Sequence, residues 1–468
     1  MKLWIRCASV SAAILILASL SLLIAIANTP PSTDPLDSPV KTASDKVLRN
    51  PSIIQQQPAK KLYKAENIAF ALKTGSETAA SRAAIQLLTF LKHAKNVLVV
   101  AEATGFRVGD LDLDDVYTNV YQAAKERIKV AAALAARNNE TAKILARRAL
   151  NSDQVIAGQN VKTKGWTLDA HKNLPALHLL HERFPKAEWY VMFDDDSFVY
   201  IDNLEEYLST LDPDEPHYIG QSNRFKGCDG VKVFGQGPRF AQGGAGIVIS
   251  RGAMKAIASI LDGCILRYKT CWAGDIRVGL CMRDAGILVK HKDGFFGIPP
   301  NANFQFPNDP CTKPFVFHHS LPHQIQSLYD LQSSKNDLTT KTVTMADIYH
   351  HIHFRDPRSK HTFQELRMQN NTDVRGKAIN YRNVGTPQEC LEICEGLIGE
   401  CVGWTWDGMT CWTKNGPGKM ETKEGMWGGV LAERYVCVPG RTYVHDASHK
   451  NPVLVEAPVA EKKNAPVA

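Results

Sequence analysis

The distribution of cysteines constrains this chain more than any other feature. The 468 residues include 11 cysteines, of which only Cys7 precedes residue 200. The remaining cysteines lie between Cys228 and Cys437, and the five from Cys390 onward fall within a short stretch. An even set of cysteines in an oxidising compartment predicts disulfide bonds, and the dense group predicts a small cross-linked unit after a larger domain.

The first residues predict that compartment. Lys2 and Arg6 precede an uncharged run, Cys7 to Ala27, whose 21 residues match the length needed to cross a bilayer. With the positive flank in the cytosol, residues 1–6 form a cytosolic tail and 7–27 a signal anchor, with the rest of the chain lumenal. The alternative is a cleaved signal peptide, and thus a secreted protein. Both interpretations agree with the glycosylation sequons at Asn139 and Asn370.

The length and composition indicate a globular chain of two or three domains. Hydrophobic residues make up 44%, and the net charge of +7 is too dilute for a nucleic-acid-binding surface. A Pro-rich stem linker is expected over 28–63, a catalytic domain over 64–335, a second linker over 336–375, the cysteine-rich unit over 376–440, and a disordered tail over 441–468.

Hydrophobic periodicity predicts an α/β fold for the large domain. A strand is expected over 66–72, a helix over 79–92 and a strand over 96–101, which together make a parallel α/β unit. Further on, a helix over 173–184 precedes an apolar strand over 188–193, and Ser250 caps a helix over 251–261. The acidic cluster 110–115 lacks the pattern of a calcium loop and is interpreted as a helix start.

Three consecutive carboxylates, Asp194, Asp195 and Asp196, follow the apolar strand at 188–193. They would repel one another unless a cation lay between them, and hard oxygen ligands suit Mn²⁺ or Mg²⁺. Ligands of open α/β sheets bind beyond the carboxyl ends of the strands. A solvated acidic turn is the alternative, but hydrophobic segments on both sides make it less favourable. The triplet therefore predicts a divalent metal site that could clamp a diphosphate.

The stretch EWYVMFDDDSFVYIDNLEEYL resembles the metal-binding segment of the Fringe-like glycosyltransferases, glycosyltransferase family 31, which includes the core 1 β-1,3-galactosyltransferases. Further motifs resemble the family in order: ALKT at 71–74, FAQGGAGIVIS at 240–250, GDIR at 274–277 and VFHH at 316–319. The resemblance covers about residues 64–335 and is nearest to the fungal and plant branch. It implies a GT-A fold, a UDP-sugar donor, Mn²⁺, and inversion at the anomeric carbon.

The resemblance also assigns the metal and catalytic residues. It implies that Asp196 binds the metal directly, that Asp194 supports it, and that His318 or its neighbour His319 completes the coordination. Asp275 would be the general base that takes the proton from the acceptor hydroxyl. The first acid of the family's acidic pair is replaced by Gly274. The position of Asp275 near a helix N-terminus predicts a stabilised, readily ionised carboxylate.

The remaining expected contacts concern the two substrates. Asp195, Thr74 and Glu102 stand at strand ends where the nucleotide should lie, and Gly243 and Gly244 would let the backbone approach the sugar and diphosphate. Trp272 precedes the base and suits stacking on the acceptor, although a core role for this tryptophan is at least as plausible.

The cysteine-rich unit does not have the paired spacing of zinc ribbons and resembles a PAN/apple domain. This resemblance implies disulfides Cys390–Cys411 and Cys394–Cys401, while Cys264–Cys281 is the favoured pair of the catalytic domain. The partners of the other four cysteines stay open: Cys228, Cys271, Cys311 and Cys437. Since each domain holds five of the ten, one interdomain bridge from Cys437 would balance both counts.

Together these features predict a Golgi type II membrane protein, attached to the membrane by one N-terminal helix and not bound to nucleic acid. Its expected activity is the transfer of a hexose or N-acetylhexosamine from a UDP-sugar to a glycan or glycoprotein acceptor, forming a β-1,3 linkage. The alternative is a glycan-binding or adhesion protein that has lost activity on the same fold.

Overall fold

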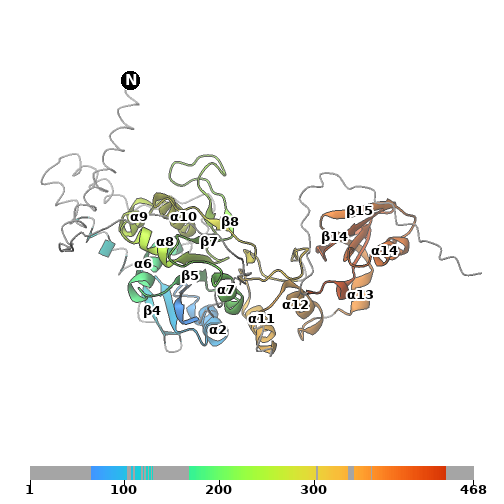
Figure 1. Cartoon of the computed structure of the whole chain (residues 1–468), viewed down its shortest axis with the longest axis horizontal. Helices are drawn as coiled ribbons and strands as arrows, with labels where there is room; N and C mark the ends of the chain where they lie inside the picture. The colour runs from blue at the N-terminus through green and yellow to red at the C-terminus, as the bar shows by residue number, and fades with distance from the viewer. Residues whose placement is uncertain are drawn as a thin grey trace, which may run out of the picture.

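A computed structural model of the chain describes residues 65–102, 168–301, 304–335, 342–359 and 361–438, with isolated residues between 107 and 129. Figure 1 shows an α/β unit joined through α11 and α12 to a smaller C-terminal unit. No helix in these ranges is long and apolar enough to cross a bilayer. The expected anchor at 7–27, the stem at 28–63, the sequon at Asn139 and the tail at 441–468 lie outside the described residues.

The α/β unit is built on an eight-stranded sheet of order β11-β7-β10-β5-β1-β2-β4-β3. Strands β5, β1, β2 and β4 run parallel, whereas β10 is antiparallel to β5 and to β7. The strands are β1 (Ile68–Lys73), β2 (Asn96–Ala101), β3 (Arg107–Val108), β4 (Leu111–Asp115), β5 (Trp189–Asp194), β7 (Tyr218–Gly220), β10 (Ile247–Ser250) and β11 (Lys290–His291).

Alternate residues of each central strand face opposite sides, so helices cover both faces of the sheet. Ile68, Phe70 and Leu72 belong to one hydrophobic cluster, whereas Ala69 and Ala71 belong to the other. The first face packs with α2 (Ala84–Leu88), α7 (Ile201–Leu208) and α11 (Pro322–Ser334). The second packs with α6 (Asn173–Arg183), α8 (Arg251–Ala258), α9 (Leu261–Arg267) and α10 (Gly274–Asp284). This is the α/β architecture expected of a GT-A-like domain.

Two short sheets complete this unit. Strand β13 (Val316–Phe317) lies between β12 (Phe295–Phe296) and β6 (Phe198–Val199), and β8 (Ser222–Asn223) pairs with β9 (Phe240–Ala241). The cluster at 110–115 was interpreted as a helix start, and this is wrong. Residues 111–115 form strand β4, in which Leu113 is buried and pairs with Val99 of β2.

The C-terminal unit is a five-stranded antiparallel sheet of order β14-β18-β16-β17-β15 covered by α14 (Pro387–Gly396). Its strands are β14 (Gln369–Arg375), β15 (Ala378–Asn383), β16 (Gly403–Trp406), β17 (Thr410–Lys414) and β18 (Lys419–Val430). Because β14 pairs with β18, the unit begins before the expected boundary at 376. The expected linker also contains α12 (Met345–His350), η4 (His351–Arg355) and α13 (Phe363–Arg367), so it is folded.

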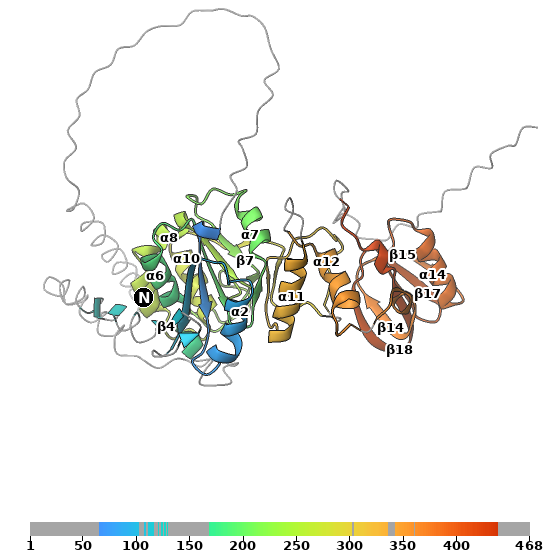
Figure 2. The ribbon, with the colours of Figure 1, turned by 90° about the horizontal axis from the view of Figure 1, so that it is seen from below.

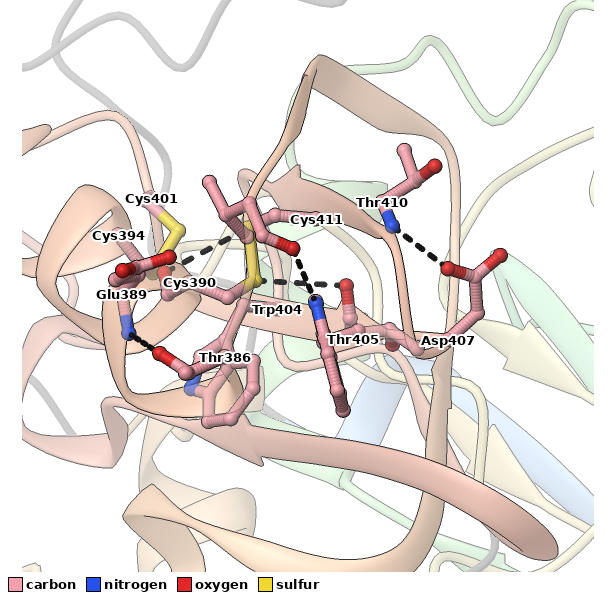
Figure 3. The surroundings of a disulfide bond; sticks show 12 residues. Thr386, Glu389, Cys390, Cys394, Cys401, Trp404, Thr405, Asp407, Thr410 and Cys411 are labelled. Atoms are coloured by element: carbon pink, nitrogen blue, oxygen red, sulfur yellow. Dashed lines mark hydrogen bonds between the residues drawn. A yellow bond between two sulfur atoms is a disulfide. The ribbon is translucent and has the colours of Figure 1, made fainter.

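The ten cysteines of the described residues form five disulfides. Cys264–Cys281, Cys390–Cys411 and Cys394–Cys401 are the pairs expected from the sequence. Figure 3 shows Cys390 and Cys394 on one helix, with Cys390 bonded to Cys411 of β17 and Cys394 bonded to Cys401, which precedes β16. Thr386 caps this helix, because its hydroxyl accepts a hydrogen bond from the backbone amide of Glu389. Cys228 pairs with Cys271, and Cys311 with Cys437, so the expected bridge between the two units is present.

Candidate active site

The acidic triplet lies where β5 ends, and each of its carboxylates has different partners. Asp194 is the last residue of β5 and is in register with Lys73 of β1, whose Nζ lies 3.0 Å from Asp194 Oδ1. Burial alone would raise the pKa of Asp194, but the Lys73 ammonium and His318 outweigh it and hold the pKa at about 2. Asp194 is therefore a half-buried, ionised carboxylate with a fixed cation beside it.

Asp195 faces the turn after β1. Its Oδ2 accepts hydrogen bonds from Thr74 Oγ1 and Thr78 Oγ1, both at 2.7 Å. Arg82, on the short π-helix η2 (Ala79–Ala83), lies 3.5 Å from Asp195 Oδ1. The structure thus brings together two residues expected at the donor site, Asp195 and Thr74, and adds Thr78 and Arg82. Neither Thr78 nor Arg82 was expected from the sequence, although they follow the ALKT motif at 71–74 by about four and eight residues.

Asp196 faces the two histidines that follow β13. Its Oδ1 lies 3.1 Å from His318 Nε2, and its Oδ2 lies 3.4 Å from His319 Nδ1. One possible ligand atom from each of these three residues lies within 4.8 Å of the other two. His318 Nε2 is also 3.6 Å from Asp194 Oδ2, but Asp194 is not part of this group. A carboxylate with two imidazoles is a donor set that suits Mn²⁺.

The backbone around the histidines is held tightly. His318 N donates to Phe296 O, and Ser320 N donates to Asp196 O. His319, between them, has a φ of 57°, a left-handed conformation that is uncommon for a residue other than glycine. Burial would lower the pKa of His318, but hydrogen bonds and charge from Asp194 and Asp196 raise it to about 9. Metal binding at this site would therefore release a proton.

Gly244 is required by the position of His318. A Cβ atom on Gly244 would stand 2.1 Å from His318 Nε2, far inside van der Waals contact. The adjacent Gly243 lies on the other side, where its amide N donates to Asp275 Oδ2 at 3.0 Å. The glycine pair after β9 therefore separates the candidate metal ligands from the candidate base, and its small size lets both approach the backbone.

Asp275 is in the first turn of α10, as expected. Its charged form was expected to be stabilised, but the raised pKa shows the opposite direction. Burial of the carboxyl raises its pKa to about 6, although hydrogen bonds from Gly243 N and Ile276 N and the charge of Lys73 act in the opposite direction. The cost of removing this carboxylate from water exceeds the stabilisation from the helix N-terminus. The glycine at 274, where the family has an acid, is explained by packing, because a Cβ there would stand 2.1 Å from Asn173 Oδ1 of α6.

Glu102 and Trp272 are both engaged by neighbouring residues. Glu102 accepts hydrogen bonds from Ser76 N at 3.0 Å and Ser76 Oγ at 2.8 Å, and lies 2.6 Å from the buried Lys172. Burial opposes ionisation of Glu102, but Lys172 and Ser76 lower its pKa to about 2. Trp272 is half-buried, and its Nε1 donates to Lys226 O, which fixes the loop beside the Cys228–Cys271 disulfide.

Gln221 and Gln242 were missed by the sequence analysis. Gln242 N donates to Gln221 O, and both side-chain Oε1 atoms converge on Gly297. A Cβ on Gly297 would stand 2.3 Å from Gln242 Oε1 and 2.8 Å from Gln221 Oε1. Both oxygens are buried, and no donor in the described part of the chain pairs with either of them. They follow β7 and β9 directly, next to the glycine pair.

Comparisons with known proteins find partial sequence similarities. Residues 235–346, which include the glycine pair, Asp275 and both histidines, match the family described as "Protein of unknown function, DUF604". The chain is 30% identical over 136 residues to Glycoprotein-N-acetylgalactosamine 3-beta-galactosyltransferase 1 of Xenopus laevis, covering 28% of this chain and 35% of that protein. It is 30% identical over 135 residues to the Beta-1,3-glucosyltransferase of Homo sapiens, covering 28% and 25%.

A third relative, Chondroitin sulfate synthase 3 of Homo sapiens, is 29% identical over 121 residues, covering 25% of this chain and 13% of that protein. The matched stretches thus span about a third or less of the length of these curated relatives. The similarity is distant and partial. The chain is a distant relative of proteins named as glycosyltransferases, several of them β-1,3-specific.

Proposed function

We propose that this chain is an inverting, metal-dependent glycosyltransferase. It transfers a hexose or N-acetylhexosamine from a UDP-sugar to a hydroxyl of a glycan or glycoprotein acceptor, with a β-1,3 linkage. The observation that carries the proposal is the arrangement around the glycine pair. Asp196 and two histidines lie on one side, and the half-buried carboxylate of Asp275, with its raised pKa, lies on the other. The relatives' names support the reaction class.

Asp196, His318 and His319 would hold Mn²⁺ or Mg²⁺, with Asp194 as a support that is ion-paired to Lys73. The ion would neutralise the charge of the diphosphate leaving group. The turn after β1 begins with Thr74, and Asp195 and Glu102 accept hydrogen bonds from it. These three residues would contact the nucleotide, while Gly243 and Gly244 leave space for the sugar. Arg82, 48% exposed, lies within reach of the same diphosphate.

Asp275 would act as the base. A carboxylate with a pKa of about 6 is ionised at neutral pH and is a better proton acceptor than an ordinary aspartate. It would take the proton from the acceptor hydroxyl as that oxygen attacks the anomeric carbon from the face opposite the UDP. Trp272, three residues earlier, would contact the acceptor. These roles require an acceptor that approaches over the Cys228–Cys271 disulfide.

The proposal includes a secretory location, with an anchor at 7–27 in the Golgi membrane. Five disulfides fit an oxidising compartment. Asn370 is exposed at the start of β14, as a glycan attachment site requires, and Asn139 is proposed on its sequon alone. The C-terminal unit retains its PAN/apple-like assignment as a proposal, supported by its two internal disulfides and its helix-covered antiparallel sheet.

The test is a UDP-sugar screen with the purified lumenal chain in the presence of Mn²⁺, measuring UDP release with and without glycan acceptors. We expect one sugar to be preferred, with loss of activity in EDTA and in Asp196→Ala. Asp293→Ala is the matched control, because this carboxylate is 89% exposed. Undiminished activity in Asp196→Ala would refute the metal assignment. If the wild-type chain bound glycans but neither Mn²⁺ nor UDP, the inactive glycan-binding protein would be the better interpretation.

A further inference from the structure

The C-terminal unit is attached to one particular segment of the α/β unit. Residues 304–317 lead directly into the two histidines, and Cys311 in this segment is bonded to Cys437, which is 126 residues further along the chain. On the same segment, Asn308 packs against the turn at Gly416, where a Cβ would stand 2.5 Å from Asn308 Oδ1. Figure 2 shows α11 and α12 between the two units, in line with the sheets on either side.

Tyr435 is the centre of this junction. Although it lies at the end of the C-terminal unit, it is only 1% exposed. Its hydroxyl donates to Pro307 O at 2.6 Å, and its own carbonyl accepts from His350 Nε2 at 3.0 Å. The tyrosine is thus hydrogen-bonded at both ends, once to the segment before the histidines and once to α12.

A continuous row of aromatic rings connects Tyr435 to the histidines. The ring of Tyr435 lies 6.3 Å from that of Phe306, which is 5.0 Å from Phe304, and Phe304 is 5.7 Å from Phe317. Phe317 stacks on Phe296 at 5.0 Å and directly precedes His318. All these side chains except Phe296 are buried members of one hydrophobic cluster, which also includes Val374, Val402 and Val430 of the C-terminal unit. The two units therefore share a core.

This packing ends at a strained point. His319 has a left-handed backbone, and such conformations persist only where the surrounding structure fixes them. The fixing contacts are the hydrogen bonds of His318 N and Ser320 N, the pairing of β13, and the aromatic row behind Phe317. An independent module tethered by a linker would need neither a buried tyrosine shared with the other unit nor a disulfide to the segment 304–317.

We propose that the C-terminal unit is a structural part of the candidate metal site. Tyr435 and the Cys311–Cys437 disulfide act as positioning residues, which hold the segment 304–317 so that His318 and His319 face Asp196. This inference rests on the proposed function only in taking the two histidines as metal ligands. Its structural part, the control of residues 315–320 by the C-terminal unit, stands apart from catalysis.

Hydrogen exchange on the full lumenal chain tests the structural part. Tyr435→Phe removes one hydrogen bond, and Cys311→Ser with Cys437→Ser removes the bridge. We expect amides of peptides covering 315–320 to exchange about tenfold faster in the bridge variant, and a few-fold faster in Tyr435→Phe, because local opening becomes easier. The matched control is Cys390→Ser with Cys411→Ser, which removes a disulfide inside the C-terminal unit. Unchanged exchange at 315–320 in Tyr435→Phe and the bridge variant overturns the proposal, whether or not the chain is an enzyme.

Mn²⁺ affinity tests the link to the metal site. In Tyr435→Phe we expect a several-fold weaker Mn²⁺ affinity in titrations of the metal alone, with UDP-sugar turnover restored by excess Mn²⁺. A variant that merely lost stability would unfold at lower temperature without this rescue. Equal Mn²⁺ affinity in the wild type, Tyr435→Phe and the bridge variant would overturn the positioning role. Absence of Mn²⁺ binding in the wild type would contradict the metal site itself, and the exchange result would then decide the structural part alone.

Discussion

Aspartates lie on both sides of the glycine pair, and their pKa values are shifted in opposite directions. Asp194 and Asp196 have pKa values below the usual range, because Lys73 and the histidines outweigh the effect of burial. Asp275 is half-buried as well, but it accepts only backbone hydrogen bonds, and its removal from water raises its pKa to about 6. The same side chain is prepared for a cation in one place and for a proton in the other.

The difference comes from the partners rather than from burial. A carboxylate with a cation in contact remains ionised at any physiological pH, which is what a metal ligand requires. A carboxylate whose nearest cation acts only at longer range can gain and lose a proton near neutral pH, as a base requires.

The largest effect is expected for Asp275→Asn, which keeps the shape and removes the base. We expect kcat to fall by about 10²–10⁴, the usual contribution of a general base, with Mn²⁺ and UDP affinities within about twofold of the wild type. In the wild type, the rate should fall as the pH decreases through about 6, because Asp275 becomes protonated. Residual activity of the variant should lack this acid limb.

The same substitution should increase stability. The pKa of Asp275 is raised from 3.8 to about 6 on folding, so its ionised form costs stability that builds up as pH rises from about 4 to 6. At pH 7.5 we expect Asp275→Asn to gain on the order of 1–3 kcal/mol in the free energy of unfolding, and no gain near pH 4. Asp293→Asn, at an exposed position, should change neither stability nor rate. Lower stability of Asp275→Asn at pH 7.5 would argue against the raised pKa.

The next largest effect is expected on Mn²⁺ affinity at the candidate metal site. In Gly244→Ala the new methyl group would overlap His318 Nε2, so the imidazole must leave Asp196. We expect Mn²⁺ affinity to fall by about 10–100-fold, as when a ligand loses its orientation, and kcat to recover partly in excess Mn²⁺. Gly263→Ala is the control, since a Cβ on that helical glycine meets nothing within 4 Å. Equal Mn²⁺ affinity in both variants would exclude His318 as a ligand.

The sequence predicted the elements that local patterns specify. The strand at 96–101 and the helix cap at Ser250 were expected where the structure has them, because they depend on short-range patterning and capping. The strand nature of residues 111–115 was missed, because three acids mask a single buried leucine whose role depends on pairing with β2. Similarly, α12 and α13 begin with the capping boxes Thr344–Asp347 and Thr362–Glu365, a local signal that was overlooked, whereas the contacts of α12 with Thr312 and with Tyr435 depend on the folded structure.

For the site, the sequence indicated residue types but not their surroundings. The family resemblance assigned Asp196, Asp275 and the histidines to one site, but the pKa of Asp275 depends on burial by residues far away in the sequence. The helix N-terminus alone suggested the opposite direction. Thr78 and Arg82 face the triplet only because η2 packs beside β5, and Gln221 and Gln242 meet only through the pairing of β8 with β9.

The smallest effect is expected at Asp195, whose Oδ2 accepts from two threonines at the same distance of 2.7 Å. In Thr74→Val, Thr78 still donates, so we expect a loss of about 1 kcal/mol, or a few-fold, in UDP affinity. The double variant Thr74→Val with Thr78→Val should lose more than the sum of the single variants, because Asp195 then keeps only Arg82 at 3.5 Å. Thr210→Val, at an exposed position, is the control. Strictly additive losses would mean that the two hydroxyls do not share one carboxylate oxygen, and that Asp195 is held in place by its backbone instead.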